Sequence, residues 1–261
     1  MTGRAPALAL ALALAACVAS PSSSSPVELT VYGAASLRNA LVQVESAYET
    51  AAPGINLVVA TDSSAALRTQ IEQGAPADVF LSADAANPQR LYDAGLVECG
   101  ITFFAANVLV VIVPSDNPAA IRTPADLAGE AVRIVAAGEE VPISQYATQV
   151  VDAIARLEGY PADFADRYAA NVVSREDNVQ AIVAKIERGE GDAGIVYQTD
   201  ALASGSVRRV PIPDQANVQA HYAGVVITTS AHPEAARAFL HWLTGRDGQA
   251  ILAEFGFLPP S

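Results

Sequence analysis

Three serine-containing turns hold the residue types whose spacing could do chemistry in this sequence. The runs GAAS, TDSS and VPIS end at Ser36, Ser64 and Ser144. Small residues let a ligand approach the backbone closely, and a hydroxyl can donate a hydrogen bond or act as a nucleophile. Helix capping is the alternative without a ligand, because serine and threonine are favoured N-cap residues.

The first two turns each join a predicted strand to a predicted helix. Residues 29–32 and 56–60 are strand-like, and the apolar spacing over residues 37–51 predicts an amphipathic helix that Pro53-Gly54 ends. In open α/β sheets, ligands bind beyond the carboxyl ends of the strands, where the N–H groups of the next helix point outward. The turns therefore lie where a binding site is expected.

The same alternation continues along the chain and predicts an α/β fold with mostly parallel sheets flanked by helices. The further elements predicted are strands at 77–81, 108–113, 132–136, 193–197 and 222–228, and helices at 64–73, 145–157, 179–188, 233–243 and 248–255.

Composition limits the classes of protein that remain. Hydrophobic residues make up 51% of the chain and charged residues 16%, which predicts a substantial core and excludes disorder. The net charge of -13, with no basic run, argues against nucleic-acid binding. Cys17 and Cys99 are the only cysteines, so no disulfide framework is expected, and Cys99 is predicted to be a small buried residue.

Residues 1–17 read as a signal peptide. Their apolar run from Ala7 to Ala16 is too short to cross a bilayer. The closing LAAC looks like a bacterial lipoprotein signal, in which cleavage leaves Cys17 as a lipidated N-terminus; ordinary cleavage in the following serine-rich stretch is the alternative. Residues 18–26 form a flexible tether, and folding is expected to begin near Val27.

The turns favour a small anion as the ligand. Each helix start offers roughly half a positive charge and several unpaired N–H donors. Since the turns themselves contain no lysine, arginine or histidine, and Arg38 and Arg68 lie further into the following helices, a fully ionised oxyanion fits the donors best. The negative net charge does not exclude this ligand, because exposed charges are screened over about 8 Å at physiological salt.

Several blocks of the sequence resemble the molybdate-binding proteins of bacterial molybdate ABC transporters. The blocks are VYGAASL at 31–37, Ser63-Ser64 with Leu67 and Gln70-Ile71, GAPADVFLSAD at 74–84, GIVY at 194–197 with Asp200-Ala201, and GQAIL at 248–252 with FGF at 255–257. The resemblance runs from about Val27 to Phe257, nearly the whole chain after the tether.

The resemblance implies a type II periplasmic binding-protein fold, in which two α/β lobes joined by two hinge crossings close on a tetrahedral oxyanion. Lobe 1 would hold residues 27–107 and 219–261, and lobe 2 residues 108–218. Each lobe would have a mostly parallel sheet flanked by helices, with the ligand cleft between the lobes.

The resemblance also implies an oxyanion site. Ser36 and Ser64 would give hydroxyl and backbone N–H contacts, Ile143 and Val179 backbone N–H groups, and Tyr197 a phenolic hydroxyl. Molybdenum would be bound only as the oxyanion through these residues, with no cofactor. Where the family often has Ala-Gly after the proline of the third turn, this chain has Ile-Ser, a change that a backbone contact tolerates.

Asp62 does not suit a site for an anion, because a carboxylate aimed at the ligand would oppose it. We expect Asp62 to face away or to cap the helix from Ser64.

By the same resemblance, the chain is expected to be an extracytoplasmic solute-binding protein of an ABC importer. It would capture molybdate or tungstate in the periplasm or at the outer face of the cell membrane, held there by its lipid anchor. It would act as a monomer and deliver the ion to a transmembrane permease served by a separate ATPase subunit. No enzymatic activity and no nucleic acid are expected.

Three alternatives stay open. The same fold could bind sulfate, phosphate or an organic acid, and an arginine inside the cleft would favour a carboxylate. A secreted serine hydrolase would use Ser36 or Ser64, but the sequence has no Gly-x-Ser-x-Gly and no Ser-x-x-Lys. A metal-binding protein would need converging ligands, but His221, His232 and His241 show no metal-ligand spacing.

Overall fold

The computed structural model describes residues 1–3 and 26–260. The predicted signal peptide beyond its first residues, the predicted lipidation site Cys17 and the predicted tether as far as residue 25 lie outside the described residues. Within the described ranges, no helix combines the length and the apolar character that a membrane span requires.

Strands and helices alternate along most of the described chain. The strands are β1 Val27–Ala34, β2 Ile55–Asp62, β3 Val79–Ser82, β4 Thr102–Pro114, β5 Ile134–Ala137, β6 Val172–Glu176, β7 Gly194–Tyr197, β8 Val207–Val210 and β9 Gln219–Val226. The helices are α1 Arg38–Ala51, α2 Ser64–Glu72, α3 Ala86–Asp93, α4 Pro142–Ile154, α5 Phe164–Ala170, α6 Val179–Glu187, α7 Gln198–Ala203, α8 Pro233–Thr244 and α9 Arg246–Glu254, with short 3-10 turns η1 Ala35–Leu37 and η2 Pro124–Ala128.

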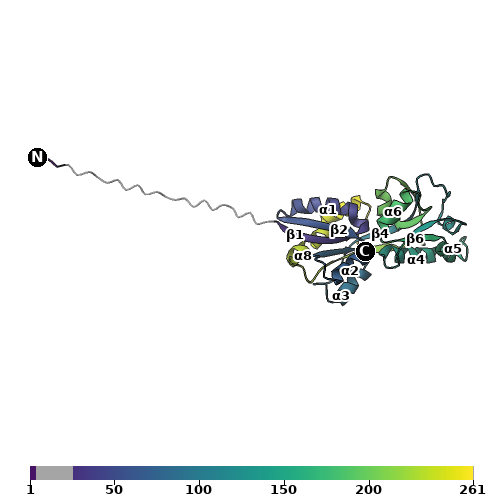
Figure 1. Cartoon of the computed structure of the whole chain (residues 1–261), viewed down its shortest axis with the longest axis horizontal. Coiled ribbons are helices and arrows are strands. Elements are labelled where there is room, and N and C mark those ends of the chain that lie inside the picture. The colour runs from purple at the N-terminus through teal and green to yellow at the C-terminus, as the bar shows by residue number, and fades with distance from the viewer. Residues whose placement is uncertain (4–25, 261) are drawn as a thin grey trace.

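The molecule has two lobes. The first lobe contains β1, β2 and β3 with α1, α2, α3, α8 and α9, and the second lobe contains β5 to β8 with α4 to α7; Figure 1 shows the two groups side by side with β4 between them. One sheet has the strand order β2-β1-β3-β9-β4-β7, with β8 also paired to β4, and β5 and β6 form a separate two-stranded sheet.

The long strand β4 connects the lobes. Residues 102–108 of β4 pair with β9, whereas residues 109–114 pair with β7 and β8 of the second lobe. The strand β9 continues this pairing into β3 of the first lobe. β4 extends into the second lobe, and β9 is paired with β3 of the first lobe. Because β4 and β9 are also hydrogen-bonded to each other, they link the two halves of the molecule.

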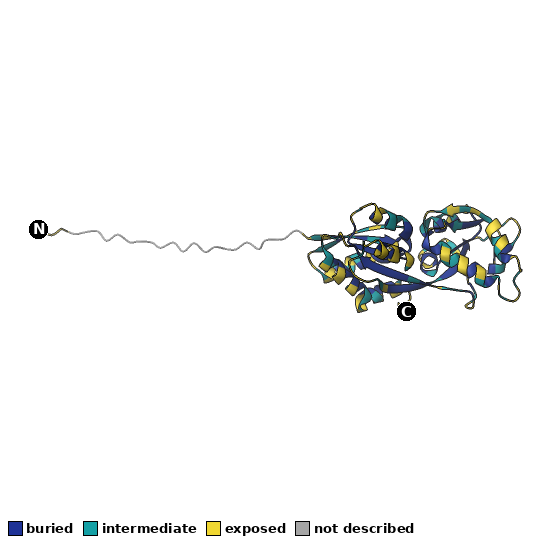
Figure 2. Cartoon of the chain, turned by 90° about the horizontal axis from the view of Figure 1, so that it is seen from below, coloured by how far each residue is buried: buried dark blue, intermediate teal, exposed yellow. Residues whose placement is uncertain are grey.

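Helices bury one face against these sheets. In α1, Leu41, Val44 and Tyr48 are buried one turn apart, and the Tyr48 ring meets the Phe239 ring of α8 edge-on with centroids 5.0 Å apart. Every residue of the central strand β3 is buried, as expected for a strand covered on both faces. Figure 2 shows buried strands inside each lobe and exposed outer faces on the helices.

The α/β fold with two lobes agrees with the sequence prediction, but the sheets are more mixed than the alternation indicated. Pairs β1–β2, β1–β3 and β5–β6 are parallel, whereas β3–β9, β4–β9, β4–β7 and β4–β8 are antiparallel. The prediction of a mostly parallel sheet in each lobe is therefore wrong for the second lobe. The reason is that β4, which continues from the first lobe into the second, runs antiparallel to both β7 and β8.

The prediction that Cys99 is buried is also wrong. Cys99 is exposed in the segment between α3 and β4. The neighbouring Glu98 is tied to this surface, because its backbone N–H donates to the Val226 carbonyl and its carboxylate pairs with Arg237. The segment thus runs along the outside of the first lobe, and its cysteine faces solvent.

Gly194 of β7 lies so close to neighbouring atoms that a larger residue there should destabilise the protein. A Cβ at this buried position of β7 would lie 2.6 Å from Ile182 Cγ2 and 3.0 Å from the carbonyl oxygen of Val135. We expect Gly194→Ala to lower the free energy of unfolding by about 1 to 3 kcal/mol through overpacking, measured by urea denaturation. Gly205→Ala is the control, because a Cβ there meets nothing within 4 Å; equal stability of the two variants would contradict the packing described here.

Candidate anion-binding site

All five residues that the sequence predicts as ligands line one small cavity between the lobes. Ser36 belongs to η1, Ser64 begins α2, Ile143 lies in the first turn of α4, Val179 begins α6 and Tyr197 ends β7. The other lining residues are Ala34, Ala35, Ser63, Ala83, Val141 and Pro142. Elements of both lobes therefore contribute to a single hollow, and none of these lining residues carries a charge.

The cavity between the lobes is small. Its volume is ≈ 10 Å³. A volume of this kind accommodates about one water molecule. A compact inorganic ion suits such a cavity better than a sugar, a peptide or a large organic acid.

The Ser36 hydroxyl is held by the buried Tyr222 hydroxyl. Ser36 Oγ lies 2.8 Å from Tyr222 Oη, and either hydroxyl can be the donor of this bond. The buried Asn107 side chain lies beside Tyr222; its Nδ2 donates to Thr199 Oγ1 at 2.9 Å, and its Oδ1 accepts from the N–H of Val108 at 3.0 Å. When the Tyr222 phenol donates to Ser36, the hydroxyl hydrogen of Ser36 is left free. The hydrogen of Ser36 can then donate into the cavity.

The Ser64 hydroxyl is arranged in the same way. The N–H of Ala83 donates to Ser64 Oγ at 3.0 Å, so the hydroxyl hydrogen of Ser64 is left to donate. The cap of α2 is the neighbouring Ser63, whose Oγ accepts from the N–H of Ala66 at 3.2 Å. Both serines line the cavity, but only Ser63 caps α2, so the Ser64 hydroxyl is not needed as the cap.

Two helix starts in the second lobe supply further donors. Pro142 is the first residue of α4, so the N–H of Ile143 is the first donor of that helix. Val179 is the first residue of α6, and its N-cap Asn178 accepts from the N–H of Ala181 at 3.1 Å. The first N–H groups of a helix have no partner within it, so these backbone donors are available to a ligand in the cavity.

Tyr197 provides a donor that has no partner inside the protein. Its side chain is 1% exposed, and its hydroxyl is buried without a hydrogen bond to any described residue. Burial raises the pKa of Tyr197 well above its ordinary value, so the phenol stays protonated. A buried hydroxyl without a partner is costly. A ligand oxygen in the cavity would satisfy it.

Asp62 does not line the cavity. Its Oδ1 accepts from the N–H of Ser63 at 2.7 Å and from Nδ2 of Asn178 in the second lobe at 3.1 Å. Of the two expectations for this carboxylate, the structure bears out that it faces away, and the role of helix cap belongs to Ser63. Asp62 is thus bound by donors of both lobes beside the cavity.

The nearest arginines are also directed elsewhere. Arg38 Nε donates to Thr61 Oγ1 at 3.1 Å, and Arg68 pairs with Glu72 at 2.6 Å. Neither belongs to the cavity lining. In the described part of the chain, no group of three or more His, Cys, Asp or Glu side chains is placed to hold a metal ion.

Sequence reasoning missed three residues that shape this site. Tyr222 was placed in a strand without a role, Asn107 fell just before a predicted strand, and Asn178 preceded the predicted start of a helix. Asn178 carried a readable signal, because asparagine is a strong N-cap residue. Tyr222 carried none, because its partner Ser36 is 186 positions away.

A buried carboxyl group lies behind the tyrosines. Asp200 is 3% exposed; its Oδ1 accepts from Nε2 of Gln180 at 2.6 Å, and its Oδ2 has no partner among the described residues. Burial raises the pKa of Asp200 to about 7. At neutral pH much of this group is therefore uncharged, which lessens repulsion of an anion near Tyr197.

Comparison with known proteins gives consistent relatives. The family model described as bacterial extracellular solute-binding protein matches residues 29–258. Molybdate-binding protein ModA of Mycobacterium tuberculosis is 34% identical over 252 residues, which cover 94% of this chain and 92% of the relative.

Two further relatives support the comparison. A protein of Bacillus subtilis whose name describes an ABC transporter substrate-binding lipoprotein is 29% identical over 243 residues, covering 91% of this chain and 89% of the relative. The solved periplasmic molybdate-binding protein of Azotobacter vinelandii superposes with a TM-score of 0.73 at 25% identity, covering 89% of this chain and all of that one.

The raised pKa of Asp200 predicts a pH dependence of stability. In the unfolded chain an aspartate titrates near 3.9, whereas burial raises the pKa of Asp200 in the folded protein to about 7. Between these values the folded protein retains a proton that the unfolded chain has released. This group therefore makes the free energy of unfolding fall as the pH rises from about 4 to 7, by at most about 1.4 kcal/mol per pH unit.

Urea denaturation of Asp200→Asn between pH 5 and 7 tests this dependence. Relative to the wild type, the variant should gain stability as the pH rises, because asparagine does not titrate. Asp214→Asn on an exposed turn is the control and should keep the wild-type slope. Parallel stability curves for wild type and Asp200→Asn would contradict the assignment.

Proposed function

Because this chain belongs to the family of bacterial extracellular solute-binding proteins, we propose that it captures molybdate, and tungstate with it, for delivery to an ABC importer. The ion would be held in the cavity lined by Ser36, Ser64, Ile143, Val179 and Tyr197. Molybdenum enters this proposal only as the oxyanion and as cargo, with no cofactor involved.

The observation that carries the proposal is the set of donors around one uncharged hollow. The N–H of Ala83 donates to the Ser64 hydroxyl and leaves its hydrogen free, the Ser36 hydroxyl lies beside the Tyr222 hydroxyl, which can donate to it, and the Tyr197 hydroxyl has no partner among the described residues. Each hydrogen bond to an ionised group contributes about 1.5 to 3 kcal/mol. A lining made of donors suits an ion that carries no proton, since a protonated oxygen would need an acceptor.

The choice of ion within this class rests on the relatives. The protein of Mycobacterium tuberculosis and the solved protein of Azotobacter vinelandii are both named for molybdate. Sulfate presents the same kind of unprotonated oxygen atoms, and the donors alone do not separate it from molybdate, whereas phosphate carries a proton at neutral pH that would need an acceptor. Calorimetric titration of the purified protein with molybdate, tungstate, sulfate and phosphate therefore tests the proposal, and tighter binding of sulfate than of molybdate would overturn it.

The proposal assigns no enzymatic activity to the chain. A serine nucleophile needs a general base within hydrogen-bond reach. The groups next to the two cavity hydroxyls are the Tyr222 phenol and the backbone N–H of Ala83, and no histidine is among the residues that line the cavity. These neighbours favour binding over turnover.

We also propose that the protein acts outside the cytoplasm as a lipid-anchored monomer. The sequence up to Cys17 supports a cleaved lipoprotein signal, and the name of the Bacillus subtilis relative describes a lipoprotein. The partner would be the transmembrane subunit of an ABC permease, with a separate ATPase subunit. Nucleic acid is no partner in this proposal.

The proposed lobe boundaries are residues 27–107 with 219–261 and residues 108–218. The pairing of β4 supports the first boundary, because β4 leaves β9 after Val108 and pairs with β7 from Leu109. The start of β9 at Gln219 supports the second boundary. Closure of the lobes on the ion would then turn about these two segments.

Removing either cavity hydroxyl should weaken binding. We predict that Ser36→Ala and Ser64→Ala each reduce the affinity for molybdate by about 1 to 3 kcal/mol, because each removes one donor to a charged ligand. Calorimetric titration measures the change, and Ser206→Ala on an exposed turn is the matched control. Wild-type affinity in both cavity variants would remove these residues from the site.

Removing the phenol that holds Ser36 should have a smaller effect. We predict that Tyr222→Phe weakens molybdate binding by about 0.5 to 1.5 kcal/mol, because Ser36 then loses the neutral hydrogen bond that directs its hydrogen. Tyr92→Phe, at an exposed position of α3, is the control. If Tyr222→Phe bound molybdate as tightly as Tyr92→Phe, the hydrogen bond from Tyr222 to Ser36 would have no role in binding.

A further inference from the structure

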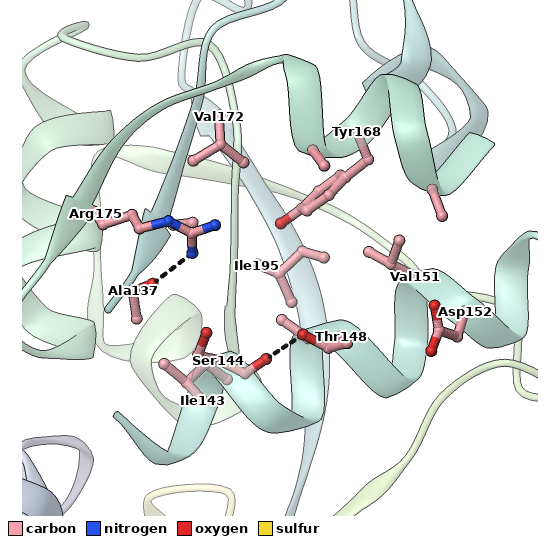
Figure 3. A pocket seen from close by; sticks show the side chains of 14 residues that line it. Ala137, Ile143, Ser144, Thr148, Val151, Asp152, Tyr168, Val172, Arg175 and Ile195 are labelled. Carbon is pink, nitrogen blue, oxygen red and sulfur yellow. Dashed lines mark hydrogen bonds between the residues drawn. The ribbon is translucent and has the colours of Figure 1, made fainter. Parts of the chain in front are cut away.

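The second lobe contains another, larger cavity. It lies between α4, α5 and the strands β5, β6 and β7, and Figure 3 shows its lining side chains. Its volume is ≈ 240 Å³, against ≈ 10 Å³ for the cavity between the lobes. Its walls are mainly small or branched apolar side chains, including Ala147, Val151, Val172 and Ile195. The space suits an organic molecule with a compact apolar body.

Two polar groups point into this cavity from different elements. Arg175 comes from β6, and its Nη1 donates to the carbonyl oxygen of Ala137 at 3.2 Å, which holds the guanidinium at the cavity wall. Tyr168 comes from α5, and Figure 3 shows its hydroxyl directed toward the side on which Arg175 lies. A cation and a hydroxyl therefore converge at one side of an apolar space.

Neither group is satisfied by a charged partner. Among the described residues no carboxylate lies within ion-pair distance of Arg175, although the chain has 28 acidic side chains and only 15 basic ones. No described residue hydrogen-bonds the Tyr168 hydroxyl. Burial raises the pKa of Tyr168 to about 12, so this hydroxyl stays a neutral donor. Both groups are thus free to bind an acceptor with a negative charge.

These features together define a ligand class. A guanidinium pairs with a carboxylate through two parallel hydrogen bonds. Apolar walls favour a hydrocarbon body and disfavour an inorganic dianion, which would lose its hydration against them. Asp152 lines another part of the cavity, away from Arg175 in Figure 3, and would repel a second carboxylate.

We propose that the cavity between α4, α5 and β6 is a second binding site, which takes a small monocarboxylate with a compact apolar body. Arg175 binds its carboxylate, Tyr168 donates a further hydrogen bond, and the walls at Val151 and Ile195 cover the hydrocarbon part. The site is a different hollow from the cavity between the lobes, although Ile143 lines both, and the proposal does not depend on the proposed oxyanion ligand.

Titration of the full chain with isobutyrate and with benzoate tests this site. Binding is followed by NMR through the methyl resonances of Val151 and Ile195, with no oxyanion added. We expect saturable shifts at these methyl groups with both carboxylates, much weaker binding of the neutral isobutyramide, and weaker binding of succinate than of isobutyrate. Absence of saturable shifts with both monocarboxylates would overturn the proposal, as would isobutyramide binding as tightly as isobutyrate or succinate binding more tightly.

Variants separate a specific site from general apolar binding. Arg175→Gln should weaken isobutyrate binding about tenfold or more, because it removes the charged donor, and Tyr168→Phe should weaken it about three- to tenfold. Arg167→Gln is the matched control, because Arg167 pairs with Asp163 on the exposed face of α5 and does not line the cavity. Circular dichroism confirms folding of each variant. Wild-type affinity in a folded Arg175→Gln or Tyr168→Phe protein would overturn the assignment.

Discussion

The proposed function depends on one constraint: an anion bound without a cationic side chain must be met by neutral donors from several segments at once. A single helix start or hydroxyl is a weak site for a charge, because each supplies only a fraction of the interaction free energy. The fold meets this constraint by bringing η1 and α2 of the first lobe against α4, α6 and the end of β7 of the second lobe. The parallel order of β2, β1 and β3 places the turns that hold Ser36 and Ser64 at the same edge of the sheet.

The acidic composition of the chain is compatible with such a site because the nearby carboxylates are occupied. Asp62 is held by Asn178 and by a backbone donor, and Asp200 is held by Gln180 and has a raised pKa. Asp84 is buried, and its carboxylate accepts from the backbone N–H and the side-chain amide of Asn87 and from the Ser82 hydroxyl. The lining of the cavity is thus left uncharged while the outer surface carries the negative charge, which salt screens over about 8 Å.

The sequence predicted those elements and site residues whose determinants lie close together in the chain. Helices α1, α2, α6 and α8 follow apolar periods and end at recognisable residues, and their predicted bounds agree with the structure within about two residues. The short α5 and the edge strand β8, whose VRRV carries two arginines, lack such a period and were missed. Strand pairing depends on residues far apart in the chain. The sequence predicts β4 only from residue 108, because Asn107 interrupts its apolar run. In the structure the strand begins at Thr102, and the buried Asn107 amide donates a hydrogen bond to Thr199. Local turns pointed to Ser36 and Ser64, while Ile143, Val179 and Tyr197 came from the family resemblance.

Each lobe supplies part of the hydrogen-bond donors around the cavity, which indicates that a bound anion would itself hold the two lobes closed. The protein's own polar contacts across the opening include Asn178 with Asp62 and the exposed pair Arg90–Glu140 at 3.3 Å. An exposed ion pair contributes about 0 to 1 kcal/mol, too little to hold two lobes together. An anion bound to the first lobe alone would meet Ser36 and Ser64 but not the donors of α4, α6 and Tyr197. The free energy of those remaining hydrogen bonds becomes available only on closure, so in the proposed function the same interactions that recognise the ion also drive the lobes together.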